Sequence, residues 1–195
     1  MGFLGFYDYT VILTYLSLLS AFSGMLAARE GNFTAAILCL LICGICDAFD
    51  GAVARTKKNR TEDEKVFGIQ IDSLCDTVSF GVFPAFLSIC MGLDGILGKT
   101  IAAMYCLCAV IRLAFFNVQE AKRQQTEAGK RKTYRGLPVT SISILYPAVY
   151  ILRRFLGAPV FRLVLHVLMA VTAFLFVLDF SVKKPNFDKL LLKSK

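Results

Sequence analysis

The sequence predicts an all-α integral membrane protein whose six transmembrane helices form a single domain over residues 1–195. The first observation is composition, because the 195-residue chain is 56% hydrophobic and its mean hydropathy is +0.63. The second is the length of the apolar stretches, several of which approach the ~20 residues that a helix needs to cross a bilayer. The third is that no internal repeat and no Ser/Gly-rich linker divides the chain.

The first span follows an N-terminal stretch whose Phe and Tyr residues suit the membrane interface. No basic segment precedes it and no small-residue cleavage site follows it, so we expect it to be retained rather than removed as a signal peptide. Aspartates interrupt the second and third spans, and the longest polar segment, 120–136, separates the fourth from the fifth. In chain order, the expected spans are 10–28, 33–54, 68–91, 98–119, 137–156 and 160–182.

Positively charged residues predict how these spans are oriented. Lys and Arg are concentrated in segments 56–67 and 120–136 and in the tail after 182, whereas the alternate loops hold few. The positive-inside rule then places both termini and the two basic loops in the cytoplasm. The net charge of +8 indicates this topology and an attraction to anionic lipid, rather than nucleic-acid binding, because the basic residues flank membrane spans. Segment 120–136 is either a solvated loop or a basic wall that recruits phosphorylated lipid.

Four aspartates lie in the most apolar part of the sequence, at Asp47, Asp50, Asp72 and Asp76. A carboxylate at the middle of a membrane helix costs roughly 2.5–3.5 kcal/mol on insertion scales, so four without a partner would cost on the order of 10 kcal/mol. Divalent cations are the simplest compensation, because hard ions take carboxylate oxygens as ligands. The sequence therefore predicts a metal site held by these four residues.

Helical spacing places the four aspartates on two stripes. Asp47 and Asp50 are three residues apart on the second span, and Asp72 and Asp76 are four apart on the third, so each pair shares one helix face. We expect the two faces to meet and to form a slot beside the carboxylates, where a ligand can approach the backbone closely. Arg55 follows the stripe on the second span and can meet a phosphate bidentately. Three small residues line the expected slot: Gly51, Ala54 and Gly68.

Together these residues resemble the signature of the CDP-alcohol phosphatidyltransferase family, D-x-x-D-G-x-x-A-R followed by G-x-x-x-D-x-x-x-D. The resemblance implies six membrane helices, a homodimer, and a single transmembrane catalytic domain that moves a phosphatidyl group from a CDP-lipid to an alcohol. It also implies two divalent metal ions, Mg²⁺ or Mn²⁺, and direct displacement without a covalent enzyme intermediate. Asp76, at the far end of its stripe, is the candidate base that takes the proton of the alcohol, and it also contacts a metal. The residues implied to bind the CDP-lipid are Gly51, Ala54, Arg55 and Gly68.

One departure from the family pattern lies between the two halves of the signature. The family usually has a shorter connection between the arginine and the next glycine, whereas twelve residues, 56–67, separate Arg55 from Gly68 here. We expect the extra residues to form a charged loop, which leaves the two halves of the signature able to face each other.

Three further segments, Ser73–Ala85, Ile111–Asn117 and Tyr134–Pro138, resemble members of the family that use CDP-diacylglycerol and L-serine. This resemblance implies that phosphatidylserine and CMP are the products. We expect the protein in a prokaryotic cytoplasmic membrane, and the basic loops place its active site on the cytoplasmic side. Phe115 stands where these relatives have a second arginine, which leaves one intramembrane cation in that span and favours a zwitterion over a phosphorylated alcohol. The candidate acceptor or phosphate contacts are Arg112, Asn117, Arg135, Ser79 and Thr77.

Two other functions stay open. A sister transferase would use glycerol phosphate or inositol phosphate, and the basic residues of 120–136 could supply a pocket for the second phosphate. Intramembrane aspartates also mark ion paths, which allows a metal or proton transporter. A transporter needs neither the small-residue slot nor Arg55, so the sequence favours a transferase.

Overall fold

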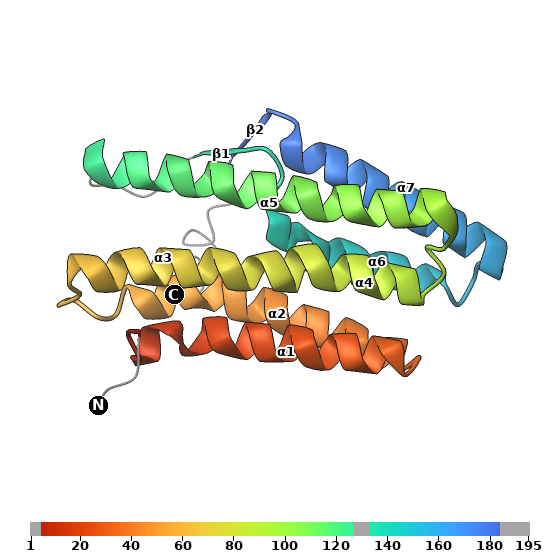
Figure 1. The fold of residues 1–195 in the computed structure, drawn as a ribbon, viewed down its shortest axis with the longest axis horizontal. Coiled ribbons are helices and arrows are strands. Elements are labelled where there is room, and N and C mark those ends of the chain that lie inside the picture. Colours follow the sequence, from red (N-terminus) through yellow and green to blue (C-terminus); the bar gives the residue numbers. More distant parts are fainter. Residues whose placement is uncertain (1–4, 127–132, 184–195) are drawn as a thin grey trace, which may run out of the picture.

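The computed structural model of the protein describes residues 5–126 and 133–183, and Figure 1 shows its bundle of long helices. A π-helix, Thr77–Val82, joins α3 to α4, and short 3-10 turns precede α1 and α6 at Tyr9–Val11 and Val139–Ser141. The helices are α1 (Ile12–Arg29), α2 (Phe33–Ala54), α3 (Glu62–Asp76), α4 (Phe83–Cys90), α5 (Gly95–Thr126), α6 (Ile142–Leu152) and α7 (Ala158–Val177).

Five helical segments of the described chain are long and apolar enough to cross a membrane, which confirms the predicted all-helical membrane class. A sixth, shorter apolar helix corresponds to the fifth predicted span. Many large apolar side chains on the outside of the bundle are exposed, as expected for a surface in contact with lipid. The five segments are Tyr9–Arg29, Phe33–Ala54, Glu62–Cys90, Gly95–Ala121 and Ala158–Val177.

The shorter helix, α6, covers only part of the predicted span 137–156. It has 11 residues, which is about 16 Å of helix at 1.5 Å per residue, against a hydrocarbon thickness of ~30 Å. Pro147 lies inside it, and Arg153 and Arg154 follow its last residue. The adjoining 3-10 turn extends the apolar helical segment to Val139–Leu152.

The third helix begins six positions earlier than predicted, at Glu62 instead of Gly68, so the expected charged loop 56–67 is wrong in its second half. Thr61 and Glu64 form a capping box, in which each side chain accepts a hydrogen bond from the other residue's main-chain N–H. The first turn of α3 is acidic, which complements the positive end of the helix dipole. These local signals start the helix before its apolar part begins.

A short pair of strands joins the ends of α5 and α7, an addition to the predicted all-helical fold. β1 (Thr133–Arg135) and β2 (Ser181–Lys183) pair antiparallel, with Tyr134 opposite Val182. Gly136 follows β1 with φ +75°, a conformation that glycine adopts without strain, and its N–H donates to the Phe180 carbonyl at 2.6 Å. The sixth predicted span, 160–182, therefore ends as a helix at Val177 and continues as extended chain.

Small residues allow α1 to pack closely against α2 and α4. The buried positions of α1 are Thr14, Ser17, Ala21, Gly24 and Ala28. A Cβ on Gly24 would lie 2.9 Å from the Cβ of Cys39 and would also collide with the Phe83 ring. Close approach of this kind is what small residues provide between membrane helices. The tight contact holds α1 against α2, which carries Asp47 and Asp50, and against α4, which follows α3 through the π-helix.

The alternating helix directions bring the predicted cytoplasmic segments together. The start of α1, the loop 55–61 and the end of α5 lie at one end of the bundle, and α7 runs toward this end but stops partway along α5 (Figure 1). The loops that contain 30–32, 91–94 and 153–157 lie at the other end. The C-terminal half of α2 and α3, which carry the carboxylates, lie in the half of the bundle nearer the first end (Figure 1).

Candidate active site

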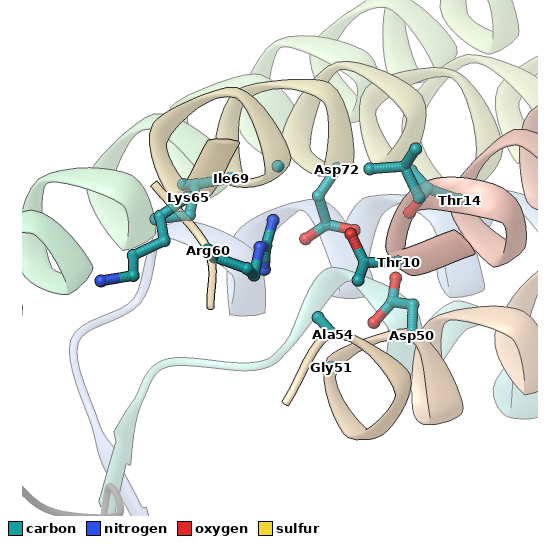
Figure 2. Close-up of a pocket in the computed structure, with 11 residues that line it drawn as sticks. Thr10, Thr14, Asp50, Gly51, Ala54, Arg60, Lys65, Ile69 and Asp72 are labelled. Atoms are coloured by element: carbon teal, nitrogen blue, oxygen red, sulfur yellow. The ribbon is translucent and has the colours of Figure 1, made fainter. Parts of the chain in front are cut away.

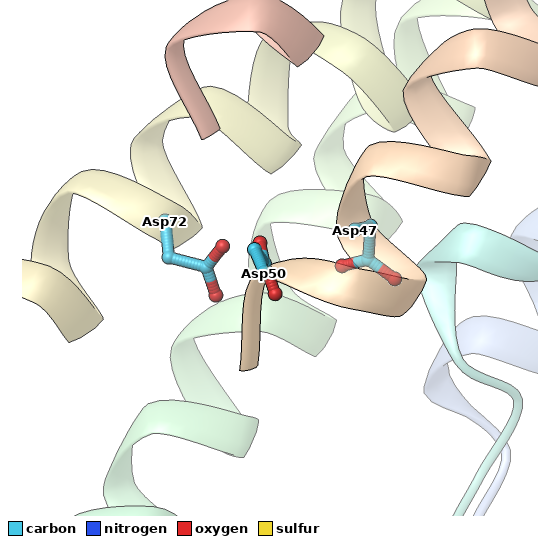
Figure 3. Close-up of side chains that lie close together, drawn as sticks. All are labelled: Asp47, Asp50 and Asp72. Carbon is cyan, nitrogen blue, oxygen red and sulfur yellow. The ribbon is translucent and has the colours of Figure 1, made fainter. Parts of the chain in front are cut away.

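Three of the four predicted carboxylates converge between α2 and α3. Asp47 and Asp50 project from α2 and Asp72 from α3, and each offers an oxygen such that all three atoms lie within 4.8 Å of one another. Figure 3 shows the carboxylates pointing into the same space from the two helices. All three side chains are partly buried. The i, i+3 spacing on α2 thus does what the sequence predicts, because the first stripe faces the second.

The donor set suits a hard divalent cation. It consists of carboxylate oxygens alone, which are the ligands that Mg²⁺, Mn²⁺ and Ca²⁺ prefer. The Oδ1 atom of Asp72 is buried and has no hydrogen-bond partner within the described part of the chain. A buried acceptor without a partner is costly, and a bound cation would satisfy it. The residues present therefore fit a metal ion.

Asp76 lies one turn beyond Asp72 and outside this three-carboxylate group. It is the most buried of the four, with 7% of its surface exposed. The π-helix Thr77–Val82 begins at the next residue, and wider turns of this kind occur frequently at functional sites. The Tyr105 hydroxyl donates to the Phe80 carbonyl at 2.7 Å and supports this segment from α5. A direct metal contact for Asp76 remains a prediction.

A cavity of about 160 Å³ lies beside the carboxylates. Its wall includes the three small residues that the sequence predicts, Gly51, Ala54 and Gly68, together with Asp50 and Asp72. Figure 2 shows side chains from three directions: the start of α1, the end of α2, and the loop and first turns of α3. The remaining lining residues, which the sequence did not predict, are Thr10, Val11, Thr14, Arg60, Lys65 and Ile69.

The arginine that lines this cavity is Arg60 and not Arg55. Arg55 is exposed, and its Nη1 lies 3.4 Å from the point where a Cβ on Gly51 would be. It runs beside the end of α2 but is absent from the cavity wall. The side chain of Arg60 points into the cavity between Lys65 and Asp72 (Figure 2). The predicted phosphate contact of Arg55 therefore stays a prediction. A second arginine, Arg60, lines the cavity beside the carboxylates.

Polar contacts fix the start of α1 against the loop before α3. Asp8 accepts hydrogen bonds from the main-chain N of Thr10 at 2.7 Å and from the Thr10 hydroxyl. Lys57 Nζ lies 2.9 Å from Asp8 Oδ2 and 2.8 Å from Glu64 Oε1. The hydrogen bonds from the Thr10 hydroxyl and then from Lys57 lower the pKa of Asp8 to about 2. Asp8 is therefore ionised at neutral pH and holds Thr10 at the cavity wall.

The predicted acceptor residues lie on α5 and on the segment after Asp76. Arg112 is 5% exposed, and its Nε donates to the Leu137 carbonyl at 3.0 Å. It lines a second cavity of about 300 Å³, which shares no lining residue with the first. Asn117 accepts a hydrogen bond from the Ser73 hydroxyl at 2.8 Å, next to Asp72 in the chain. Asn117 thus comes closer to the carboxylate helix than the sequence alone could show.

The other three candidates have different surroundings. Ser79 is fully buried, and its hydroxyl lies 3.1 Å from that of Ser17 on α1, which gives it a role in helix packing. Thr77 donates to the Ser73 carbonyl at 2.8 Å within its own helix. Arg135 lies in β1, and its side chain is outside the described residues. Acceptor binding by these residues is not tested by the structure.

Comparison with known proteins identifies relatives of the whole helical region. The sequence matches the family model described as CDP-alcohol phosphatidyltransferase over residues 9–178. It is 31% identical over 152 residues to the CDP-diacylglycerol–serine O-phosphatidyltransferase of Saccharomyces cerevisiae, which covers 72% of this chain and 54% of that protein. It is 33% identical over 140 residues to the archaetidylserine synthase of Methanothermobacter thermautotrophicus, with 70% and 56% covered.

A third relative is the CDP-diacylglycerol–serine O-phosphatidyltransferase of Methanocaldococcus jannaschii. It is 31% identical over 134 residues, which cover 69% of this chain and 57% of that protein. The chain thus spans about half the length of the curated relatives it matches. No solved structure matches the chain. The match over 9–178 includes the three carboxylates, the first cavity with its small-residue slot, and every lining residue of the second cavity except Asp179.

Proposed function

We propose, on the premise that the chain belongs to the CDP-alcohol phosphatidyltransferase family, that it transfers the phosphatidyl group of CDP-diacylglycerol to the hydroxyl of L-serine. The products would be phosphatidylserine and CMP. The observation that carries the transferase assignment is the convergence of Asp47, Asp50 and Asp72 beside a cavity with a small-residue wall. Serine as the acceptor is supported by the names of the curated relatives.

In this reaction each group of residues has a separate task. Asp47, Asp50 and Asp72 would hold divalent ions, proposed as two Mg²⁺ or Mn²⁺, which would neutralise the diphosphate and polarise the phosphorus that is attacked. Gly51, Ala54 and Gly68 leave room for the nucleotide to approach the helix backbones. Asp76 takes the proton of the serine hydroxyl, so that an alkoxide-like oxygen attacks the phosphorus. The buried position of Asp76 keeps water away from this proton transfer.

The assay that tests this function measures CMP release by the purified protein with CDP-diacylglycerol and Mn²⁺. Serine, glycerol phosphate and inositol phosphate are offered in separate reactions. We expect release with serine to exceed release with either phosphorylated alcohol and with no acceptor. Release that depends on glycerol phosphate or inositol phosphate instead would assign the chain to a sister transferase. No release with any acceptor, together with metal transport by proteoliposomes, would favour the transporter alternative.

Arg112 supplies the proposed contact to the serine carboxylate, because it is a buried cation that lines the second cavity. We expect Arg112→Ala to raise the apparent KM for serine more than the KM for CDP-diacylglycerol. Arg112→Lys keeps the positive charge. Comparing it with Arg112→Ala therefore separates the effect of losing the charge from the effect of losing the packing of the side chain. Arg154→Ala, which changes an exposed arginine near the other end of the bundle, is the matched control. An equal or larger effect on CDP-diacylglycerol would assign Arg112 to the lipid phosphate.

The chain is an integral membrane protein, and we propose that it acts as a homodimer in a prokaryotic cytoplasmic membrane with both termini and the active site on the cytoplasmic side. Family resemblance supports the dimer, and the basic loop 56–61 at the end that carries the carboxylates supports the orientation (Figure 1). In this orientation the soluble acceptor reaches the site directly. No nucleic-acid partner is proposed.

Cysteine labelling tests this orientation. A cysteine introduced at Thr126, the last residue of α5, is expected to react with a membrane-impermeant reagent only after permeabilisation of the cells. Arg154→Cys, in the loop that follows α6 at the other end, is the control and should react in intact cells. The reverse pattern would place the carboxylates on the outer side.

A further inference from the structure

The side chain of Arg60 occupies part of the small-residue slot. Its Nη2 donates to the main-chain carbonyl of Glu64 at 2.8 Å. Its Nε is buried and has no hydrogen-bond partner within the described residues. None of the ion pairs in the part of the chain that the structure describes involves Arg60, although Asp50 and Asp72 line the same cavity. A cation is thus held inside the cavity with one of its donors unused.

Gly68 leaves the space that this guanidinium fills. A Cβ on Gly68 would lie 2.5 Å from Arg60 Nη2, which is closer than non-bonded atoms can approach. Other atoms of the same guanidinium lie 3.6 and 3.9 Å from that point, and no other residue comes as close. The small residue of the third span therefore provides a seat for Arg60. Gly51 does not provide such a space for Arg60, because a Cβ on Gly51 would lie near Arg55 instead, 3.4 Å from its Nη1.

The start of α3 determines where Arg60 lies. Arg60 directly precedes Thr61, the N-cap of α3, and its anchor is the main chain of Glu64. Glu64 is itself held twice, because its carboxylate accepts from the Thr61 N–H at 2.8 Å and pairs with Lys57. Arg60 belongs to the connection 56–67 between the two halves of the signature. This connection therefore brings a cation back to the site.

An unused guanidinium donor in a partly buried cavity indicates an anionic ligand. Leaving such a donor without a partner costs free energy, and the planar fork of arginine matches phosphate geometry. The neighbouring carboxylates repel an anionic ligand unless cations lie beside it, and Arg60 is one such cation. The proposed substrate brings a diphosphate to this place.

We propose that Arg60, seated on Gly68, binds a phosphate of the nucleoside diphosphate group of the substrate. This role rests on the proposed function and adds to it a binding residue that lies outside the signature. Lys58 lies in the same connection, is exposed and does not line the cavity. It is therefore the matched control for Arg60.

The test measures equilibrium binding of CDP and of cytidine to the purified, detergent-solubilised protein with Mn²⁺. Hydrogen bonds to charged groups contribute about 1.5–3 kcal/mol, so we expect Arg60→Gln to weaken CDP binding by about 10- to 100-fold. Cytidine, which lacks phosphate, should bind the variant as it binds the unchanged protein. The CDP affinity of Arg60→Lys should lie between those of Arg60→Gln and the unchanged protein, and Lys58→Gln should bind CDP normally.

Each contrary outcome has its own meaning. Unchanged CDP binding by Arg60→Gln would overturn the role of Arg60. An equal loss of CDP and cytidine binding, or a lowered thermal unfolding midpoint without nucleotide, would reduce Arg60 to a structural residue and overturn it too. A raised KM for serine with unchanged CDP binding would move Arg60 to the acceptor and also overturn it. Failure of the unchanged protein to bind CDP would overturn the proposed function itself.

A double-mutant cycle tests whether Gly68 leaves the space that the Arg60 guanidinium needs. Gly68→Ala should displace the guanidinium, so it should weaken CDP binding in the unchanged background but add little to Arg60→Gln. Full additivity of the two losses would show that Gly68 contacts the ligand independently of Arg60. That result would overturn the proposal that Gly68 positions the Arg60 guanidinium. Gly51→Ala is the comparison, because its expected effect is additive with Arg60→Gln.

Discussion

Removing divalent cations with EDTA is expected to abolish CMP release, and added Mg²⁺ or Mn²⁺ is expected to restore it. The three converging carboxylates and the unpartnered Oδ1 of Asp72 motivate this expectation. Stabilisation of developing charge by a Lewis acid contributes several kcal/mol, and each 1.4 kcal/mol changes a rate tenfold. Loss of the metal should therefore lower turnover by about 10³-fold or more.

Substitutions of single ligands sharpen this test. Asp47→Ala and Asp72→Asn should lower both Mn²⁺ binding, measured by equilibrium dialysis, and binding of CDP-diacylglycerol, because the diphosphate needs the cations beside the carboxylates. Asp94→Asn, at an exposed aspartate in the loop between α4 and α5, is the control and should leave both unchanged. Full activity in excess EDTA, or unaltered Mn²⁺ binding by both ligand variants, would contradict a metal-dependent site.

The meeting of the two carboxylate stripes was predictable because it follows from helix geometry alone. Residues three or four apart share a face whatever the rest of the protein does, and the cost of buried carboxylates requires the two faces to meet around a common ligand. The small residues Gly51, Ala54 and Gly68 were predicted at the cavity wall for the same reason. Hydropathy likewise predicted the membrane class.

The sequence also contains a signal for the start of α3, but a prediction from hydropathy alone misses it. Thr61 and Glu64 have the spacing of a capping box, which is a local signal for a helix start. A polar first turn does not register on a hydropathy scan, so the prediction began the span at Gly68, where the apolar part begins. Local capping, and not hydrophobicity, sets the first residue of this helix.

Arg60 and the strand pair after α5 could not be predicted, because they depend on how distant segments meet. The path of loop 55–61 decides which of its cations turns inward, and that path is set by Lys57 reaching both Asp8 and Glu64. The pairing of β1 with β2 joins segments on either side of α6 and α7. No periodicity or motif in one segment reports on such contacts.

Asp76→Asn is expected to keep binding of CDP-diacylglycerol and to lose nearly all turnover. Asp76 lies outside the three-carboxylate group, so the variant leaves Asp47, Asp50 and Asp72 in place to hold the cations and the diphosphate. An amide has nearly the shape of the carboxylate but cannot accept the proton of the serine hydroxyl. General-base catalysis typically contributes 10²–10⁴-fold, so the rate should fall by about that factor.

The contrast between Asp76→Asn and Asp47→Ala separates proton transfer from ligand binding. Substrate binding and turnover should fall together in Asp47→Ala, whereas only turnover should fall in Asp76→Asn. Because Asp76 is 7% exposed, its replacement by a neutral amide removes a buried charge, and we expect the thermal unfolding midpoint not to fall. If Asp76→Asn kept more than about a tenth of the original rate, the general-base role would be wrong. If it lost CDP-diacylglycerol binding as Asp47→Ala does, Asp76 would instead be a fourth ligand, as the spacing of the stripe on α3 first predicted.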